Sequence, residues 1–426
     1  MVNGFFRRTG FWIIDLLKGG EIRKNYIDIK NHFRNNKVND EKLSDLLAYA
    51  TKNVPFYKEY DEKDILSFPV INKNDIKENW EQLHSTAYDG PVHLMSTSGS
   101  TGTPFTMEWD IGKRKRQLAE VIYFNELAGQ RLGQPYIYFR VWTDKNRKSK
   151  KELWKQNLIP ISILNLDDNT LEQIRQRLKR KPYVNYCLGY ASTYEHLVKY
   201  LESNGDNPNM FHTTSFVSSS EVLSMKMKQK IKDIVGCKII DRYSNEENGF
   251  LAQTGDLSDE FIVNIASFHI EILKQDSDEI AEIGEVGRIV VTDLYSYAVP
   301  LIRYDTGDLA VKGAEVDGWV TMLKSIQGRR VDVIYDTSGK VLTSHTWSVY
   351  MWKYDKLKQY QFIQNGKKDY VLKLNGSKGI YEDDEIIEYL KSVLGNDANI
   401  IIEHVDGIPV LSSGKFKKTV CNYRPE

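Results

Sequence analysis

The feature that most constrains the fold is an alternation of strand-like and helix-like segments between residues 161 and 240. Short apolar runs are separated by longer runs in which apolar residues recur at helical spacing. Such alternation predicts βαβ units and a largely parallel sheet. The expected strands are 161–164, 183–188, 215–217 and 238–240, and the expected helices are 170–180, 192–204 and 224–235.

Different patterns flank this region. Residues 20–85 have helical spacing broken by turn signals, residues 92–109 resemble a strand–loop–strand, and residues 260–325 alternate like short β-strands. We therefore expect an α/β protein with two domains. The large N-terminal domain, residues 1–329, would combine parallel βαβ sheets with a β-rich subdomain. Residues 330–426 would form a small α+β C-terminal domain.

The segment 97–104 consists almost entirely of glycine and hydroxyl-bearing residues. Glycines permit positive φ and allow backbone N–H groups to converge on one point, and hydroxyls add short, adaptable donors. This combination suits a loop that wraps polyphosphate oxygens, although a surface linker has the same composition. No lysine follows Gly102, so the segment is not the G-x-x-x-x-G-K-[ST] loop of P-loop enzymes.

Composition argues against two other classes of protein. Lys+Arg and Asp+Glu both number 58, and a general nucleic-acid binder would be basic. The cysteines, Cys187, Cys237 and Cys421, are odd in number and have no C-x-x-C spacing. They therefore indicate neither a disulfide framework nor a structural zinc site. Free thiols fit a reducing compartment, so we expect a cytoplasmic protein.

The N-terminal segment has an apolar run at residues 11–17, which Asp15 interrupts. The run is too short to span a bilayer, and no small-residue cleavage site follows it. We therefore expect neither a transmembrane segment nor a signal peptide. Two interpretations stay open: a helix that docks on the protein body, and a peripheral contact with a membrane or partner through Arg7, Arg8 and the neighbouring aromatic residues.

Five polar motifs follow one another along the chain, and their order resembles that of the adenylate-forming superfamily of acyl-CoA synthetases, peptide-synthetase adenylation domains and luciferases. Segments 54–57 and 68–75 resemble the N-terminal signature of its phenylacetate-CoA ligase-like group. The early chain and the compact C-terminal part are most similar to the capsular-polysaccharide-biosynthesis branch of that group. The five motifs are 97–104, 241–247, 303–308, 328–332 and 412–415.

The resemblance implies a binding site for ATP. The loop 97–102 would hold the β- and γ-phosphates, and Tyr243 matches the aromatic residue that stacks on adenine. Asp308 matches the acceptor for both ribose hydroxyls, for which a carboxylate offers paired oxygens. Arg329 matches the arginine that contacts ribose or phosphate at the domain junction. The expected nucleotide-binding residues are Thr97, Ser98, Gly99, Ser100, Thr101, Gly102, Ser220, Glu221, Asp241, Tyr243, Ser244, Asp308 and Arg329.

The resemblance also implies a metal ligand, a mobile lysine and a hinge. Glu247 matches the acidic residue that binds Mg²⁺, and a cation with bound phosphates needs only one or two protein carboxylates. Lys415 matches the lysine that enters the site during adenylation and contacts the acyl carboxylate and the α-phosphate. Val331 and Asp332 lie in the hinge segment, about which the mobile small domain would rotate between two half-reactions.

Two positions depart from the family pattern. Ser244 stands where glycine is usual, and Glu246 stands where serine or threonine is usual. Extra negative charge beside the phosphates would reposition the metal or select an acyl group that bears an amine. In the acyl pocket, Arg140 would pair with a second anionic group or form a structural salt bridge. The residues expected by position to line that pocket are Arg140, Trp142, Tyr190 and Ser192.

The resemblance implies a ligase that uses ATP and Mg²⁺ to convert a carboxylic acid into an acyl-adenylate, with release of pyrophosphate. The acceptor of the acyl group is CoA by analogy with the named ligases, or an amine in surface polysaccharide biosynthesis. Two alternatives remain: transfer of AMP to a hydroxyl, and a scaffold that binds nucleotide without turnover. Substitution of Lys415 discriminates between a catalyst and a binding module.

Overall fold

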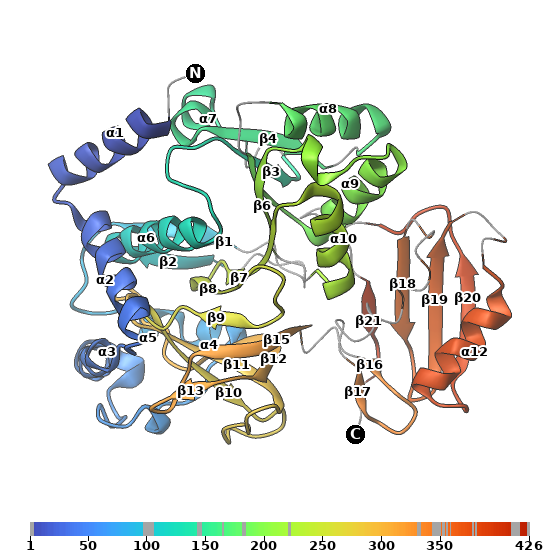
Figure 1. Ribbon diagram of the computed structural model, residues 1–426. Coiled ribbons are helices and arrows are strands. Elements are labelled where there is room, and N and C mark those ends of the chain that lie inside the picture. The colour runs from blue at the N-terminus through green and yellow to red at the C-terminus, as the bar shows by residue number, and fades with distance from the viewer. Residues whose placement is uncertain are drawn as a thin grey trace.

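The computed structural model describes residues 4–96, 106–142, 147–163, 166–180, 185–219, 223–329, 334–342, 359–376, 381–409 and 418–423, with the single residues 351, 354, 357 and 379. Figure 1 shows a main body built on one large sheet and a smaller sheet formed by C-terminal residues. No helix in these ranges is long and apolar enough to cross a membrane.

Helices make up the first part of the chain, as the spacing within residues 20–85 predicts. The helix that follows Asn72 begins with a capping box. The Asn72 side chain accepts a backbone N–H of the first turn, and the Asp75 side chain accepts the backbone N–H of Asn72. Leu46 and Leu47 belong to the core cluster of the β-rich part of the body. The elements are α1 (Gly4–Leu17), α2 (Glu21–Asn35), α3 (Asp40–Asn53), η1 (Pro55–Tyr57), η2 (Ile65–Ser67), α4 (Lys73–Glu78) and α5 (Trp80–Leu83).

A hairpin carries the Gly-rich segment, which confirms the strand–loop–strand expected at residues 92–109. Its strands are β1 (Val92–Ser96) and β2 (Thr106–Asp110), which pair antiparallel. The long helix α6 (Ile111–Leu127) follows directly, and Asp110 caps it by accepting the N–H of Lys113.

One half of the eleven-stranded sheet is parallel, with the strand order β7-β6-β5-β3-β4. This confirms the βαβ units expected from the sequence. Apolar faces of the connecting helices pack on the sheet around Ile137, Phe139 and Phe216. The elements are β3 (Tyr136–Arg140), α7 (Lys150–Gln156), β4 (Leu158–Ser162), α8 (Asp168–Lys179), β5 (Asn185–Gly189), α9 (Ala191–Ser203), η3 (Pro208–Met210), β6 (Thr213–Ser219), α10 (Met225–Val235) and β7 (Lys238–Asn245).

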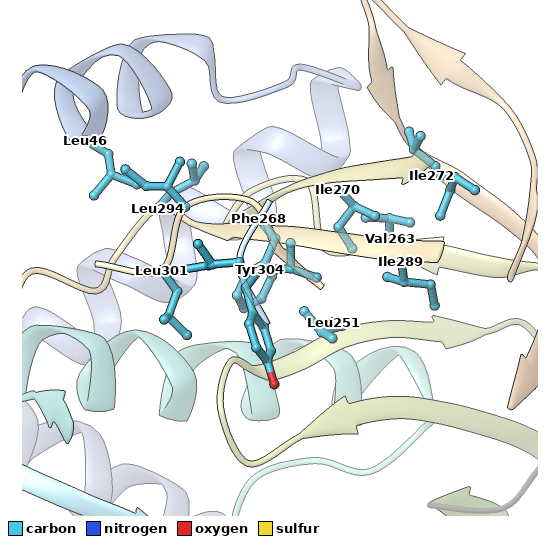
Figure 2. Packing of buried hydrophobic residues seen from close by; sticks show 14 of the residues in the cluster. Leu46, Leu251, Val263, Phe268, Ile270, Ile272, Ile289, Leu294, Leu301 and Tyr304 are labelled. Atoms are coloured by element: carbon cyan, nitrogen blue, oxygen red, sulfur yellow. The ribbon is translucent and has the colours of Figure 1, made fainter. Parts of the chain in front are cut away.

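The other half of the sheet is antiparallel, in the order β10-β11-β12-β15-β9-β8, and continues from β7. Its core joins the strands to α3, and Figure 2 shows Leu46 and Leu294 together with residues of β8 to β12. The ring of Tyr304 lies in this cluster, and its hydroxyl points out of it. The strands are β8 (Gly249–Thr254), β9 (Phe261–Val263), β10 (Phe268–Leu273), β11 (Val286–Asp293), β12 (Tyr304–Lys312) and β15 (Met322–Arg329). Between β12 and β15, β13 (Glu315–Val316) and β14 (Trp319–Val320) pair as a separate two-stranded sheet.

The C-terminal residues form a four-stranded sheet in the order β20-β19-β18-β21, covered by α12 (Figure 1). Ile386, Leu390 and Leu394 of the helix pack on Phe362 and Leu372 of the sheet, forming a separate core. The elements are β16 (Ile334–Tyr335), β17 (Val341–Leu342), β18 (Gln359–Gln364), β19 (Asp369–Asn375), α12 (Asp383–Leu394), β20 (Asn399–His404) and β21 (Thr419–Cys421).

Candidate functional site

The carboxyl ends of adjacent parallel strands bring several predicted residues to one edge of the large sheet. Trp142 follows β3, Tyr190 follows β5 and Glu247 follows β7, and these strands run in the same direction with β6 between β5 and β7. In open α/β sheets ligands bind outside the carboxyl ends of the strands. This edge is therefore where a substrate site is expected.

Glu247 lies in the turn between β7 and β8, and its side chain is only 3% exposed. Its Oε1 lies 2.6 Å from the Nζ of Lys73 and accepts a hydrogen bond from the hydroxyl of Tyr304 at 3.3 Å. Its backbone carbonyl accepts a hydrogen bond from Nε1 of Trp109 at 2.9 Å. Because Trp109 lies on β2, the hairpin that carries the Gly-rich segment is anchored beside Glu247.

Backbone pairing brings Lys73 to this position. Ile71 forms a parallel bridge with Tyr304, in which the N–H of Ile71 donates to the carbonyl of Arg303 and the N–H of Asp305 donates to the carbonyl of Ile71. Lys73 then opens α4, two residues after the bridge. The N-terminal signature and the 303–308 motif are thus one physical unit.

Tyr243 and Asp308 also meet, although they lie on strands that are not neighbours. The hydroxyl of Tyr243 donates to Oδ2 of Asp308 at 2.8 Å. Burial raises the pKa of Asp308 above its ordinary value, and burial together with the Asp308 carboxylate raises the pKa of Tyr243. The guanidinium of Arg329 pairs across β12 and β15 with Asp308, with Nε 4.0 Å from Oδ1.

The backbone of the 303–308 motif is bent so that Asp308 can reach this position. Arg303 has a φ of +52°, and Gly307 has a φ of +78°, where glycine is unstrained. Arg303 is held by two hydrogen bonds to the buried Glu271, at 2.9 and 3.1 Å. Asp305 accepts the N–H of Gly307 at 2.8 Å, which closes the turn before Asp308.

The carboxylate of Asp241 is engaged in a buried ion pair. Its Oδ2 lies 2.7 Å from the Nζ of Lys228, and its Oδ1 accepts the N–H of Leu223 at 3.3 Å. Burial raises the pKa of Asp241 to about 6, against the opposing effect of the Lys228 ammonium. The neighbouring Ser244 is exposed, as is Glu246. Asp241 thus supports the strand that carries Tyr243 and Glu247.

The residues expected to line an acyl pocket come from two adjacent strands. Arg140 ends β3, and its guanidinium lies 5.4 Å from the ring of Trp142 and 5.5 Å from the ring of Tyr138. Tyr190 is the residue before α9, and Ser192 lies in the first turn of that helix. Because β3 and β5 are parallel neighbours, all four predicted residues lie at the same edge of the sheet as Glu247.

Several predicted residues have no described position. They include the phosphate loop, the segment after β6, the hinge and the C-terminal lysine. The residues outside the described ranges are Thr97, Ser98, Gly99, Ser100, Thr101, Gly102, Ser220, Glu221, Val331, Asp332 and Lys415.

A magnesium ion bound by ATP fits the donors around Glu247. No group of three His, Cys, Asp or Glu side chains that could hold a metal occurs within the described ranges. A phosphate-bound Mg²⁺ needs only one or two protein carboxylates, because phosphate and water oxygens fill its other positions. Glu247, buried beside a cation at the edge of the sheet, meets that requirement, and Asp308 is committed to Tyr243 and Arg329.

Sequence reasoning assigned no role to Lys73, Tyr304 or Trp109 at the site. Lys73 did leave a signal, because it occupies the first position of α4, where the helix dipole disfavours a positive charge. Tyr304 lies inside the 303–308 motif but has the pattern of an ordinary core aromatic residue. Trp109 resembles any buried residue of a strand, and only the folded chain shows its bond to Glu247.

The chain is similar to proteins of one superfamily over most of its length. Residues 334–422 match the family described as the CapK C-terminal domain. Over 416 residues the chain is 24% identical to Protein CapK of Staphylococcus aureus, covering 91% of this chain and 89% of that protein. It is 25% identical over 301 residues to a phenylacetate-coenzyme A ligase of Thermus thermophilus, covering 64% of each.

Solved structures share the same fold at low sequence identity. A 2-hydroxyisobutyryl-CoA ligase in the postadenylation state with 2-HIB-AMP matches with a TM-score of 0.69 and 15% identity, over 89% of this chain and 88% of that chain. ATP-bound MatB of Rhodopseudomonas palustris matches with a TM-score of 0.53 and 14% identity, over 76% and 66%. The α/β fold expected from the sequence is therefore confirmed.

Proposed function

We propose that this chain, a member of the adenylate-forming superfamily in its CapK-like branch, activates a carboxylic acid with ATP and releases pyrophosphate. The observation that carries the proposal is the joint placement of Glu247, Lys73, Tyr243 and Asp308. Strand β12 holds both carboxylates: its Tyr304 donates to Glu247, which lies beside Lys73, and its Asp308 accepts from Tyr243.

The nucleotide would bind across this set of residues. The ring of Tyr243 would stack on adenine, and Asp308 would accept hydrogen bonds from the vicinal diol of ribose in place of its present contact with Arg329. Ser220 and Glu221 would lie against adenine and ribose. Asp241, through its ion pair with Lys228, holds β7, the strand that carries Tyr243. The loop 97–102 would hold the β- and γ-phosphates with its backbone N–H groups.

Charge around the phosphates would be balanced by the protein. Mg²⁺, held by Glu247, would neutralise the charge that develops on the phosphoryl oxygens. Lys73 lies close enough to Glu247 to act at the same phosphates, and a shift of its ammonium from carboxylate to phosphate would free Glu247 for the cation. Lys415 would contact the acyl carboxylate and the α-phosphate, which aligns them for attack.

The second half-reaction would use a rotation of the C-terminal domain, residues 330–426, against residues 1–329 about Val331 and Asp332. Among the described residues, the C-terminal sheet and α12 enclose a core of their own, as a domain that moves as one unit requires. The acyl group would pass to CoA, as the coenzyme A ligases among the relatives suggest, or to an amine in surface polysaccharide biosynthesis.

The acyl pocket would lie at the ends of β3 and β5. Arg140, Trp142, Tyr190 and Ser192 would line it, with an aromatic wall and a guanidinium above it. Among the described residues, Nε of Arg140 and Nε1 of Trp142 are buried donors without a hydrogen-bond partner. Buried donors are normally paired, so a bound substrate would supply the acceptors. A substrate that carries an anionic or carbonyl group in addition to the reacting carboxylate would accept hydrogen bonds from these two donors.

The test is release of pyrophosphate from ATP and Mg²⁺ in the presence of a panel of aryl acids, amino acids and uronic acids, without CoA or added amine. Acid-dependent release that Lys415→Ala abolishes supports acyl-adenylate formation. ATP binding without pyrophosphate release with any acid of the panel would overturn the proposal. It would favour either an enzyme that transfers AMP to a hydroxyl or a scaffold that binds nucleotide without turnover. Addition of CoA or amines to the active pair then identifies the acceptor.

A further inference from the structure

Helix α1 presents its apolar side outward. Six large apolar residues of this helix are between 53% and 81% exposed, although most surface helices turn such residues toward the core. Together with the 60% exposed ring of Trp154, they form what we call the N-terminal apolar face. Its residues are Phe5, Phe6, Ile13, Ile14, Leu16, Leu17 and Trp154.

The other side of α1, which carries Arg7, Trp12 and Asp15, faces the protein. The guanidinium of Arg7 lies 4.6 Å from the ring centre of Trp154 and donates to its backbone carbonyl. Asp15 is buried and accepts the N–H groups of Ile22 and Arg23 at the start of α2. These contacts fix the orientation of α1, so the outward apolar side is a feature of the folded chain.

Positive charge predominates in the segment of the chain that contains most of the N-terminal apolar face. Residues 4–37 contain eight Lys or Arg residues against three acidic residues, in a chain whose total net charge is zero. Each acidic residue is neutralised by the protein: Asp15 caps α2, Glu21 pairs with Lys115 and Asp28 pairs with Arg116. The basic residues that remain exposed are Lys18, Arg23, Lys24, Lys30, Arg34 and Lys37.

We propose that the N-terminal apolar face binds the surface of an anionic lipid bilayer. A helix with a broad apolar side and flanking Lys/Arg lies in the membrane interface, with its apolar side among the acyl chains and its charges at the headgroups. Trp is favoured at that depth. At a rise of about 1.5 Å per residue, α1 is too short to cross a bilayer but long enough to lie on one. The protein would then act at a membrane surface, on a substrate held there.

The experiment is flotation of the full chain with vesicles of phosphatidylcholine alone and of phosphatidylcholine with phosphatidylglycerol. We expect binding to the anionic vesicles that falls as salt rises. Ile13→Gln/Leu17→Gln lowers the partition coefficient by about tenfold, because two exposed apolar side chains no longer enter the lipid. Arg23→Gln/Lys24→Gln lowers it by about tenfold on anionic vesicles only.

The controls separate lipid binding from general surface effects. Ile401→Gln changes an equally exposed apolar residue on β20, and Lys58→Gln/Lys63→Gln removes two exposed charges outside this region. Both controls retain wild-type partition, and all variants retain the ATP binding of the wild type, which shows that they are folded. No binding to anionic vesicles overturns the proposal. Self-association of the chain that Ile13→Gln/Leu17→Gln abolishes, without vesicle binding, assigns the face to a second copy instead.

Discussion

The ammonium of Lys73 lies 2.6 Å from Oε1 of Glu247, and this contact joins the N-terminal signature to the centre of the candidate site. The two residues come from distant parts of the chain, and the bridge between Ile71 and Tyr304 sets their separation. A buried carboxylate needs a cation beside it. The contact therefore gives the buried carboxylate of Glu247 a cation as its partner.

Lys73→Met should lower acid-dependent release of pyrophosphate by about a hundredfold, because it removes positive charge from the phosphate region and leaves Glu247 without its ion-pair partner. The measurement is kcat and KM for ATP, with the thermal midpoint recorded alongside. Lys77→Met, an exposed lysine of the same helix, is the matched control and should behave as wild type. Equal activity of both variants would exclude a role for Lys73 in the site.

Tyr243→Phe should raise the KM for ATP by about two- to tenfold, because Asp308 loses one donor while the ring is kept. Tyr243→Ala should raise it further, since the stacking surface is lost as well. Tyr123→Phe, a partly buried tyrosine whose ring stacks on Phe33, is the control. If the Phe and Ala variants of Tyr243 show the same KM, its ring does not contact the base.

Arg303→Gln should destabilise the protein by about 3–5 kcal/mol, because Glu271 would remain buried without its cation. Burial already raises the pKa of Glu271, so this carboxylate depends on Arg303 to stay charged. The measurement is the calorimetric midpoint of unfolding. Lys274→Gln breaks an exposed ion pair with Glu279 and should leave the midpoint unchanged. A similar midpoint for both variants would contradict the structural role of Arg303.

The stability of the protein should fall between pH 7 and pH 5, in part through His269. Burial, with the nearby Arg303, lowers the pKa of His269 from 6.5 to about 4. Between these two pKa values the unfolded chain binds more protons than the folded chain. The free energy of unfolding therefore increases as pH rises and decreases as pH falls. The contribution amounts to about 2 kcal/mol between pH 7 and pH 5.

His269→Gln should therefore flatten the dependence of the unfolding midpoint on pH, while the exposed His196→Gln leaves the dependence as in wild type. Calorimetric scans from pH 5 to pH 7.5 measure the two slopes. An unchanged slope in His269→Gln would show that His269 is protonated in the folded chain.

Local patterns were sufficient to predict the class of fold and most of its elements. The alternation between residues 161 and 240 predicted the parallel strands β4 to β7 and their helices, because period-two and helical spacing of apolar residues reflect local backbone geometry. The capping box of Asn72 and Asp75 at the start of α4 is local in the same way, since a cap acts within one turn.

Partners of charged residues could not be predicted in this way. Asp241 pairs with Lys228, and Glu247 pairs with Lys73, but the spacing of these residues does not indicate which lysine meets which carboxylate. An ion pair depends on which surfaces the fold brings together, and burial then decides its strength. For the N-terminal segment the sequence left both a docking helix and a peripheral contact open, and the fold shows that six large apolar residues of α1 are exposed.

The sequence by itself determined the α/β class of the fold, since element type depends on residues close together in the chain, and it showed motifs that resemble those of adenylate-forming proteins, since their order is read along the chain. Only the tertiary structure decided that Lys73 meets Glu247, that Tyr243 meets Asp308 and that α1 turns its apolar residues to solvent. These relations depend on how distant segments pack, and packing energy is a property of the whole fold.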